Sequence, residues 1–136
     1  MLLAKTRSKA GHWETDLMEG SRKTHHVVSA TVERRSGAFM LDKLSSKESK
    51  EKMDAMVSRM ERIPIHIRKT MTFDNGTENT IGLVREYLPK GMDLTNVTQQ
   101  ELMVIGTAIN ERPRKRLGYK TPNEVLLQEA GWCVTS

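Results

Sequence analysis

The stretch THHVVSATVERRSGAFMLDKL, residues 24–44, alternates apolar and polar side chains on both sides of a short turn signal. Side chains two positions apart point to the same side of a β-strand, so one face of its first half is apolar, formed by Val28, Ala30 and Val32. Ser36-Gly37 then favours a turn, and AFMLDKL (38–44) has the composition of a following strand. The stretch predicts one strand over 24–34, a turn, and a second strand.

Upstream, HWETDLM (12–18) alternates in the same way and predicts an earlier strand. Three strands joined by short links indicate an antiparallel meander, because parallel neighbours need long crossovers. Residues 46–62 switch to helical periodicity, with a Ser45–Glu48 capping box. The helix carries one predicted buried stripe, formed by Met53, Met56, Val57, Met60 and Ile63.

Downstream of Pro64, KTMTFD (69–74) predicts a fourth strand, and the remainder is helical. The predicted helices cover 79–88, a segment opened by a Thr98–Glu101 capping box, and a segment opened by Thr121-Pro122. The order β-β-β-α-β followed by helices predicts a mixed α/β fold.

The chain has 136 residues, enough for one domain, and its 22 Lys and Arg against 17 Asp and Glu give a net charge of +5. This surplus suits an anionic partner such as nucleic acid, and it is equally common in ordinary basic proteins. The single cysteine, Cys133, cannot form an internal disulfide, and no stretch approaches the ~20 apolar residues of a membrane span. We therefore expect a soluble, cytoplasmic protein with no membrane partner.

Three acids stand at informative positions: Asp16 inside the first predicted strand, Asp74 at the end of the fourth, and Glu78 four residues later. A carboxylate inside a strand is costly to bury unpaired, so the simplest interpretation is that its face is solvated. Acids on adjacent strands with a third on a following helix can also bind hard cations such as Mg²⁺ through oxygen ligands. Spacing alone leaves both interpretations open.

The segment ERPRKRLGYK (111–120) concentrates positive charge around Tyr119, with Pro113 and Gly118 opposing a regular helix. Its cationic residues are Arg112, Arg114, Lys115, Arg116 and Lys120. Such a loop can bind phosphates with guanidinium groups while the aromatic ring packs on a sugar or base. A solvated linker between helices is the equally weighted alternative.

Several blocks resemble one known family, in order along nearly the whole chain: GHWETDLMEG (11–20), VERRSGAFMLDKL (32–44), TFDNG (72–76), TENTIGLVREYLPKGMDL (77–94) and NERPRKRLGYKTPNEVL (110–126). They are similar to the catalytic domain of insertion-sequence-30 family transposases. The resemblance implies the ribonuclease-H-like fold of the retroviral integrase catalytic core. It also implies a DDE triad that binds Mg²⁺ or Mn²⁺ and catalyses DNA strand cleavage and transfer.

The resemblance assigns the triad residue by residue. The aspartate of the family's G-H-W-E-x-D block falls on Asp16, and that of its T-F-D-N-G block falls on Asp74. The family's final glutamate precedes N-T-x-G-L-x-R, a position that Glu78 occupies here. These three acids are therefore the expected catalytic and metal-binding residues.

Two departures from the family pattern stand out. The family's N-terminal helix-turn-helix region, which recognises element ends, has no counterpart in these 136 residues. The family also places a few dozen residues, forming a helix and the fifth strand, between the D-N-G and E-N-T blocks, which are fused here in TFDNGTENT (72–80). We therefore expect a single, truncated domain over 1–136, with an internal deletion near 76–78. A lost strand would leave an open sheet edge, which predicts low stability or self-association.

The sequence thus predicts a protein of DNA transposition whose partners are the insertion-sequence ends and target DNA. Because of the lost strand, we expect this truncated copy to be inactive more often than active by itself. Association with a second copy or with full-length transposase is also expected. The alternative is a non-catalytic fragment that binds DNA through the basic segment, or interferes with the full-length transposase.

Overall fold

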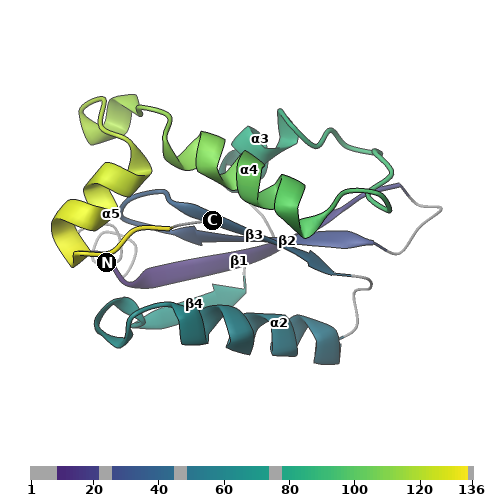
Figure 1. Cartoon of the computed structure of the whole chain (residues 1–136), viewed down its shortest axis with the longest axis horizontal. Coiled ribbons are helices and arrows are strands. Elements are labelled where there is room, and N and C mark those ends of the chain that lie inside the picture. The colour runs from purple at the N-terminus through teal and green to yellow at the C-terminus, as the bar shows by residue number, and fades with distance from the viewer. Residues whose placement is uncertain (1–8, 22–25, 45–48, 74–77, 135–136) are drawn as a thin grey trace.

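The computed structural model describes residues 9–21, 26–44, 49–73 and 78–134. Figure 1 shows a β-sheet with helices on both of its faces. The elements in chain order are β1 (His12–Glu19), β2 (Val27–Glu33), β3 (Phe39–Leu44), α2 (Ser49–Arg62), β4 (Thr70–Phe73), α3 (Glu78–Arg85), α4 (Gln99–Asn110) and α5 (Pro122–Ala130). None of the described helices is both long and apolar enough to cross a membrane.

The four strands lie in the order β3-β2-β1-β4. β1 pairs antiparallel with β2, and β2 pairs antiparallel with β3, so the predicted meander is confirmed. β4 pairs parallel with β1, on the side away from β2. Such a parallel return needs a crossover, which α2 and a short 3₁₀ turn at Ile65–Ile67 provide. The β-β-β-α-β order and the mixed α/β class are confirmed.

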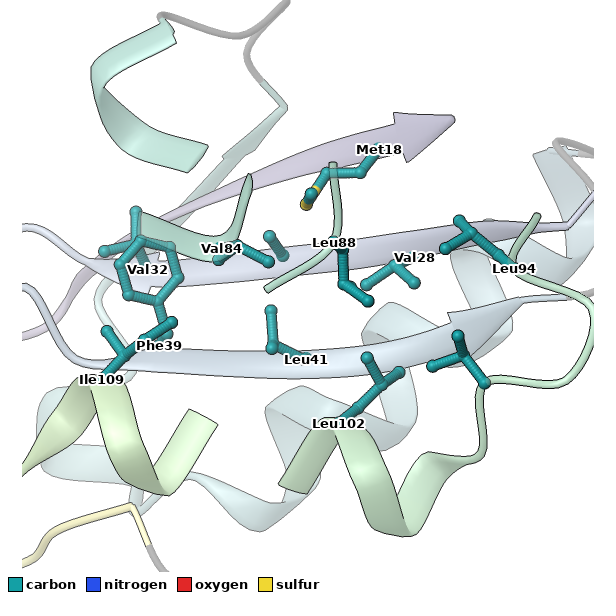
Figure 2. Close-up of a cluster of buried hydrophobic side chains, with 12 residues drawn as sticks. Met18, Val28, Val32, Phe39, Leu41, Val84, Leu88, Leu94, Leu102 and Ile109 are labelled. Carbon is teal, nitrogen blue, oxygen red and sulfur yellow. The ribbon is translucent and has the colours of Figure 1, made fainter. Parts of the chain in front are cut away.

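Two apolar clusters cover the two faces of the sheet. The first, shown in Figure 2, packs Met18, Val28 and Leu41 of the sheet against residues such as Leu102 and Ile109 of α4 and Val84 of α3. The second packs Trp13 and Met40 with Ile63, Ile67 and Leu126 of α5. Trp13 is fully buried, and its indole N–H donates to the Ile67 carbonyl at 2.9 Å.

Helix boundaries follow the predicted capping residues where these are described. The Thr98 hydroxyl accepts a hydrogen bond from the Glu101 amide and begins α4, and Thr121 with Glu124 forms a full capping box at α5. α2 ends at Arg62, just before Pro64. The predicted Ser45–Glu48 box lies outside the described residues.

The predicted buried stripe of α2 is wrong at two positions. Met53 and Val57 are about half exposed, whereas Ile63 is buried and Met60 packs against the second cluster. Helical periodicity identifies an apolar face, but burial needs a surface that covers it. Only the C-terminal part of this face meets the second cluster, so the apolar surface of Met53 and Val57 stays open in the described structure.

The outer edge of β3 presents main-chain groups that β2 cannot reach. The Glu33 amide donates to the Ala38 carbonyl at 2.9 Å, which sets the alternation of hydrogen bonds along the antiparallel pair. The residues that direct their N–H and C=O groups outward are therefore Phe39, Leu41 and Lys43.

Two side-chain amides of α4 bind this outer edge. Buried Asn110 accepts from the Phe39 amide at 2.7 Å and donates to the Phe39 carbonyl at 2.9 Å. Gln99 accepts from the Lys43 amide at 2.8 Å and donates to the Leu41 carbonyl at 2.7 Å. Both amides project from one face of α4. The helix therefore supplies the hydrogen bonds that a neighbouring strand would otherwise make.

The outer edge of β4 has no such cover in the part of the sheet that the structure describes. The Thr70 amide donates to the Gly11 carbonyl at 3.2 Å, so Thr70 and Thr72 direct their main-chain groups toward β1. Met71 and Phe73, which alternate with them, direct theirs outward. Within the described residues, β4 is therefore an edge strand whose outward main-chain groups meet no other strand.

Candidate active site and basic surface

Asp16 lies in the middle of β1, opposite Ala30 of β2. Side chains alternate along a strand, so Asp16 shares a face with Glu14 and Met18, and Met18 belongs to the cluster under α3 and α4. Only 8% of Asp16 is exposed. The interpretation of a solvated strand face is therefore wrong for this acid, and its burial requires the polar partnership that buried carboxylates need.

The same face of β1 carries a row of polar side chains that are held in place. Glu14 forms an ion pair with Arg34 at 2.8 Å, and both side chains are largely buried. His12 Nδ1 lies 2.8 Å from Thr70 Oγ1, across the β1–β4 pair. These contacts hold the part of β1 that precedes Asp16 in place, through Arg34 and through Thr70 of β4.

The described part of the parallel ladder between β1 and β4 runs up to the residue before Asp16. Its last described pair is Thr15 with Phe73. In the sequence, each of these residues is followed directly by an aspartate, Asp16 and Asp74. Asp74 lies outside the described residues, and Asp16 is therefore the predicted triad member whose side chain the structure places.

Glu78, the third predicted acid, is the first residue of α3. Its side chain lies outside the described set, but the helix is anchored further along by Val84, which is fully buried in the cluster beside Met18. α3 therefore packs on the sheet face that carries Asp16. Arg85 at its end donates to the Glu19 carbonyl of β1 at 3.4 Å, and burial lowers the pKa of Arg85.

A metal centre cannot be assembled from the described side chains alone. Among them, no group of three or more His, Cys, Asp or Glu residues is placed to hold an ion. Two of the three predicted ligands lie outside that set, at Asp74 and Glu78. The chemistry of the donors does fit, because carboxylate oxygens are the ligands that Mg²⁺ and Mn²⁺ prefer.

Two residues of the basic segment are bound by neighbouring side chains. Arg112 pairs with Glu86 at 2.9 Å and donates to the Tyr87 hydroxyl at 3.0 Å, and the hydrogen bond to Glu86 raises its pKa. Lys120 donates to Gln128 Oε1 at 2.9 Å. Two of the five predicted DNA-binding residues are thus held by neighbouring side chains.

Arg114 and Arg116 reach back to the turn between β2 and β3. Arg114 donates to the Gly37 carbonyl at 3.5 Å, and Arg116 donates to the Arg35 carbonyl at 3.2 Å. Lys115 is exposed, and Tyr119 is 69% exposed in a left-handed conformation. These residues form a cationic surface with an accessible aromatic ring.

Glu33 is a structural acid that the sequence analysis did not single out. It is fully buried at the end of β2, and its carboxylate accepts from the Gly11, Arg35 and Ser36 amides and from the Ser36 hydroxyl. The signal lies in its spacing, since an acid three residues before a serine in a tight turn can bind the turn's amides. Glu33 organises the turn over which Arg114 and Arg116 lie.

Known proteins of similar sequence are transposases. No family model matches the chain. The transposase InsI of insertion sequence element IS30A from Escherichia coli (strain K12) is 31% identical over 150 residues, covering 88% of this chain. The transposases of IS1086 from Cupriavidus metallidurans and of IS4351 from Bacteroides fragilis are 32% and 30% identical, covering 90% and 93% of the chain.

The chain belongs to the IS30 family of transposases. This IS30-family chain spans less than half the length of these relatives, at 39%, 44% and 47%. The alignment with InsI of IS30A runs over 150 positions, yet 88% of 136 residues is only about 120. About 30 positions of the relative inside the aligned region therefore have no counterpart here.

The fold of the IS30-family chain is that of an integrase catalytic core. The catalytic core domain of BIV integrase superposes with a TM-score of 0.55 at 16% identity, covering 88% of this chain and 95% of the integrase chain. The predicted ribonuclease-H-like fold is thus confirmed.

Proposed function

We propose that this chain serves DNA transposition as the domain that cleaves and joins DNA strands, acting on insertion-sequence ends and target DNA. The observation that carries the proposal is the β1–β4 register, whose last described pair is Thr15 with Phe73, the residues that directly precede Asp16 and Asp74 in the sequence. Burial of Asp16 on the face that α3 covers is consistent with a recessed acidic site rather than a surface charge. Family membership supplies the reaction class.

In this proposal Asp16, Asp74 and Glu78 hold Mg²⁺ or Mn²⁺. The bound ions would activate an attacking oxygen and stabilise the leaving oxygen of a phosphodiester. The chain's own contribution is placement: β1 fixes Asp16 between its two neighbouring strands, and the Arg34–Glu14 ion pair neutralises the nearest acid on that face. Negative charge at the site is then concentrated on the proposed triad.

A nicking assay tests this function. Supercoiled DNA carrying the element's terminal repeats is incubated with the chain and Mg²⁺ or Mn²⁺, beside Asp16→Asn and the exposed control Glu19→Gln on the same strand. We expect metal-dependent nicking that Asp16→Asn abolishes and Glu19→Gln retains. Nicking that persists in Asp16→Asn, or that needs no metal, contradicts the proposal.

A second function, a non-catalytic fragment that binds DNA, is favoured by the basic surface around Arg114, Lys115 and Arg116. DNA binding there would fall steeply with salt, because phosphate contacts release counterions. In the same assay this function predicts salt-dependent binding by the unaltered chain without metal-dependent nicking. The two functions therefore give different outcomes in one experiment.

We further propose that the positions of the relative that have no counterpart here fall near residues 76–78, where TFDNGTENT merges two family blocks. We also propose that the outer edge of β4 binds a second copy of the chain. Antiparallel pairing centred on Thr72 would let Met71 exchange main-chain hydrogen bonds with Phe73 of the other copy, and the reverse. Association would thus give the outward main-chain groups of β4 the hydrogen-bond partners that they lack in a single copy. Sedimentation equilibrium tests this: a monomer at all concentrations contradicts it.

A further inference from the structure

The turn between β2 and β3 brings two guanidinium groups to one glycine. Gly37 has a φ of +75°, and a Cβ added there would lie 2.7 Å from an Nη atom of Arg116 and 3.3 Å from one of Arg114. These two nitrogens are therefore no more than about 6 Å apart. The absence of a side chain at Gly37 leaves the space in which the two cations converge.

Convergence of like charges is unfavourable unless an anion compensates it. Arg114 is half-buried, and its Nε is a buried donor with no hydrogen-bond partner among the described residues. Burial lowers the pKa of Arg114, and the positive charges of Arg116 and Arg112 lower it further.

Two other arginines of this surface differ from Arg114, because each of them is paired with a carboxylate. Arg35 pairs with Glu129 at 2.9 Å, and Arg112 pairs with Glu86 at 2.9 Å. Arg114 instead has a long contact to a main-chain carbonyl and a positive neighbour on its other side. Among the described residues, Arg114 is therefore a half-buried cation with no carboxylate paired to it.

We propose that Arg114 and Arg116 form a seat for a DNA backbone phosphate over Gly37, at the β2–β3 turn. Guanidinium groups present paired N–H donors that match the oxygens of a phosphodiester. Exposed Lys115 and Tyr119 lie in the same segment and extend the surface along a strand of DNA. The seat rests on the proposed DNA function and specifies which basic residues carry it.

Salt-dependent DNA binding tests the seat. The affinity of the intact chain for a short DNA duplex is measured from low to moderate salt, beside Arg114→Gln/Arg116→Gln. The control, Lys50→Gln/Arg62→Gln, removes the same charge from exposed positions of α2. One lost phosphate contact reduces the slope of log affinity against log salt by about 0.9 and the affinity in 0.1 M salt by about tenfold.

The seat predicts this loss for the Arg114/Arg116 variant and an unchanged slope for the α2 variant, with thermal melting curves showing that both are folded. If the double variant unfolds, Arg116→Gln alone is used, because Arg116 is exposed. We expect it to bind DNA more weakly than the unaltered chain and to have the same melting temperature. An unchanged slope in a folded variant overturns the seat and means that the two arginines only brace the turn. Absence of salt-dependent binding by the unaltered chain instead overturns the proposed DNA function itself.

Discussion

The two edges of the sheet differ in whether their outward main-chain groups have hydrogen-bond partners. At β3, the chain supplies its own substitute for a strand, because Asn110 and Gln99 bind four outward main-chain groups. At β4, the outward groups of Met71 and Phe73 meet no strand in the described structure. A bare edge of this kind is a template for pairing with another chain, and natural proteins usually protect it.

The difference bears on the internal deletion that we propose near residues 76–78. Side chains of α4, a helix of 12 residues, bind the outward main-chain groups of β3, so this edge needs no further strand. β4 ends inside the fused blocks at 72–80, and about 30 positions of the IS30A transposase within the aligned region have no counterpart in this chain. The open edge is therefore the one that we assign to the lost segment.

Removing the amide that closes β3 should have the largest effect. Asn110→Ala leaves the Phe39 amide and carbonyl without their partner next to a buried cluster, and each unsatisfied group costs about 1–3 kcal/mol. We expect a loss of about 3 kcal/mol in the free energy of unfolding, measured by urea denaturation. Exposed Asn96→Ala serves as control, and equal stability of the two variants would refute the closed-edge interpretation.

A charge on the open edge should weaken association rather than folding. Thr72 is exposed, and in the proposed pairing it lies opposite itself, so Thr72→Lys places two like charges together. We expect the dimer dissociation constant to rise at least about tenfold by sedimentation equilibrium, which corresponds to about 1.4 kcal/mol. Ser58→Lys on α2 adds the same charge elsewhere, and an equal effect there would mean that β4 is not the contact.

The outer amide of the β3 edge should matter least. Gln99 is exposed, so water can replace part of its bonds to the Leu41 carbonyl and the Lys43 amide. We predict a loss of about 1 kcal/mol for Gln99→Ala in the same denaturation experiment. Its exposed neighbour Gln100 provides the matched control, and a loss as large as that of Asn110→Ala would contradict the ranking of the two amides.

Local patterns were sufficient to predict much of this fold. Alternation over 24–44 predicted the antiparallel strands, and the Thr98 and Thr121 caps predicted where α4 and α5 begin. Contacts between distant residues were not predictable in this way. Asn110 lies 71 residues from Phe39, and nothing in its own helix shows that it would bind an edge strand. Exposure of Met53 and Val57 was missed for the same reason, because periodicity does not show what covers a face.

The candidate site shows the same division. Asp16 was identified by the family block, and its burial and its place in the β1–β4 register are long-range facts that strand alternation could not supply. The convergence of Arg114 and Arg116 on Gly37 depends on a turn about 77 residues upstream. The cationic composition of 111–120 was visible in the sequence, whereas the selection of two arginines from that segment required the fold.

Amide hydrogen exchange at the two edges tests most directly the proposal that a segment missing beside β4 leaves this edge open. Exchange at the Met71 and Phe39 amides is measured in dilute solution, for the chain and for a variant with the intervening segment of the IS30A transposase inserted near residues 76–78. We predict that Phe39 exchanges slowly in both, whereas Met71 exchanges fast in the chain and slowly in the variant. A protected Met71 amide in the dilute, unaltered chain, or fast exchange that persists after the insertion, would contradict the account.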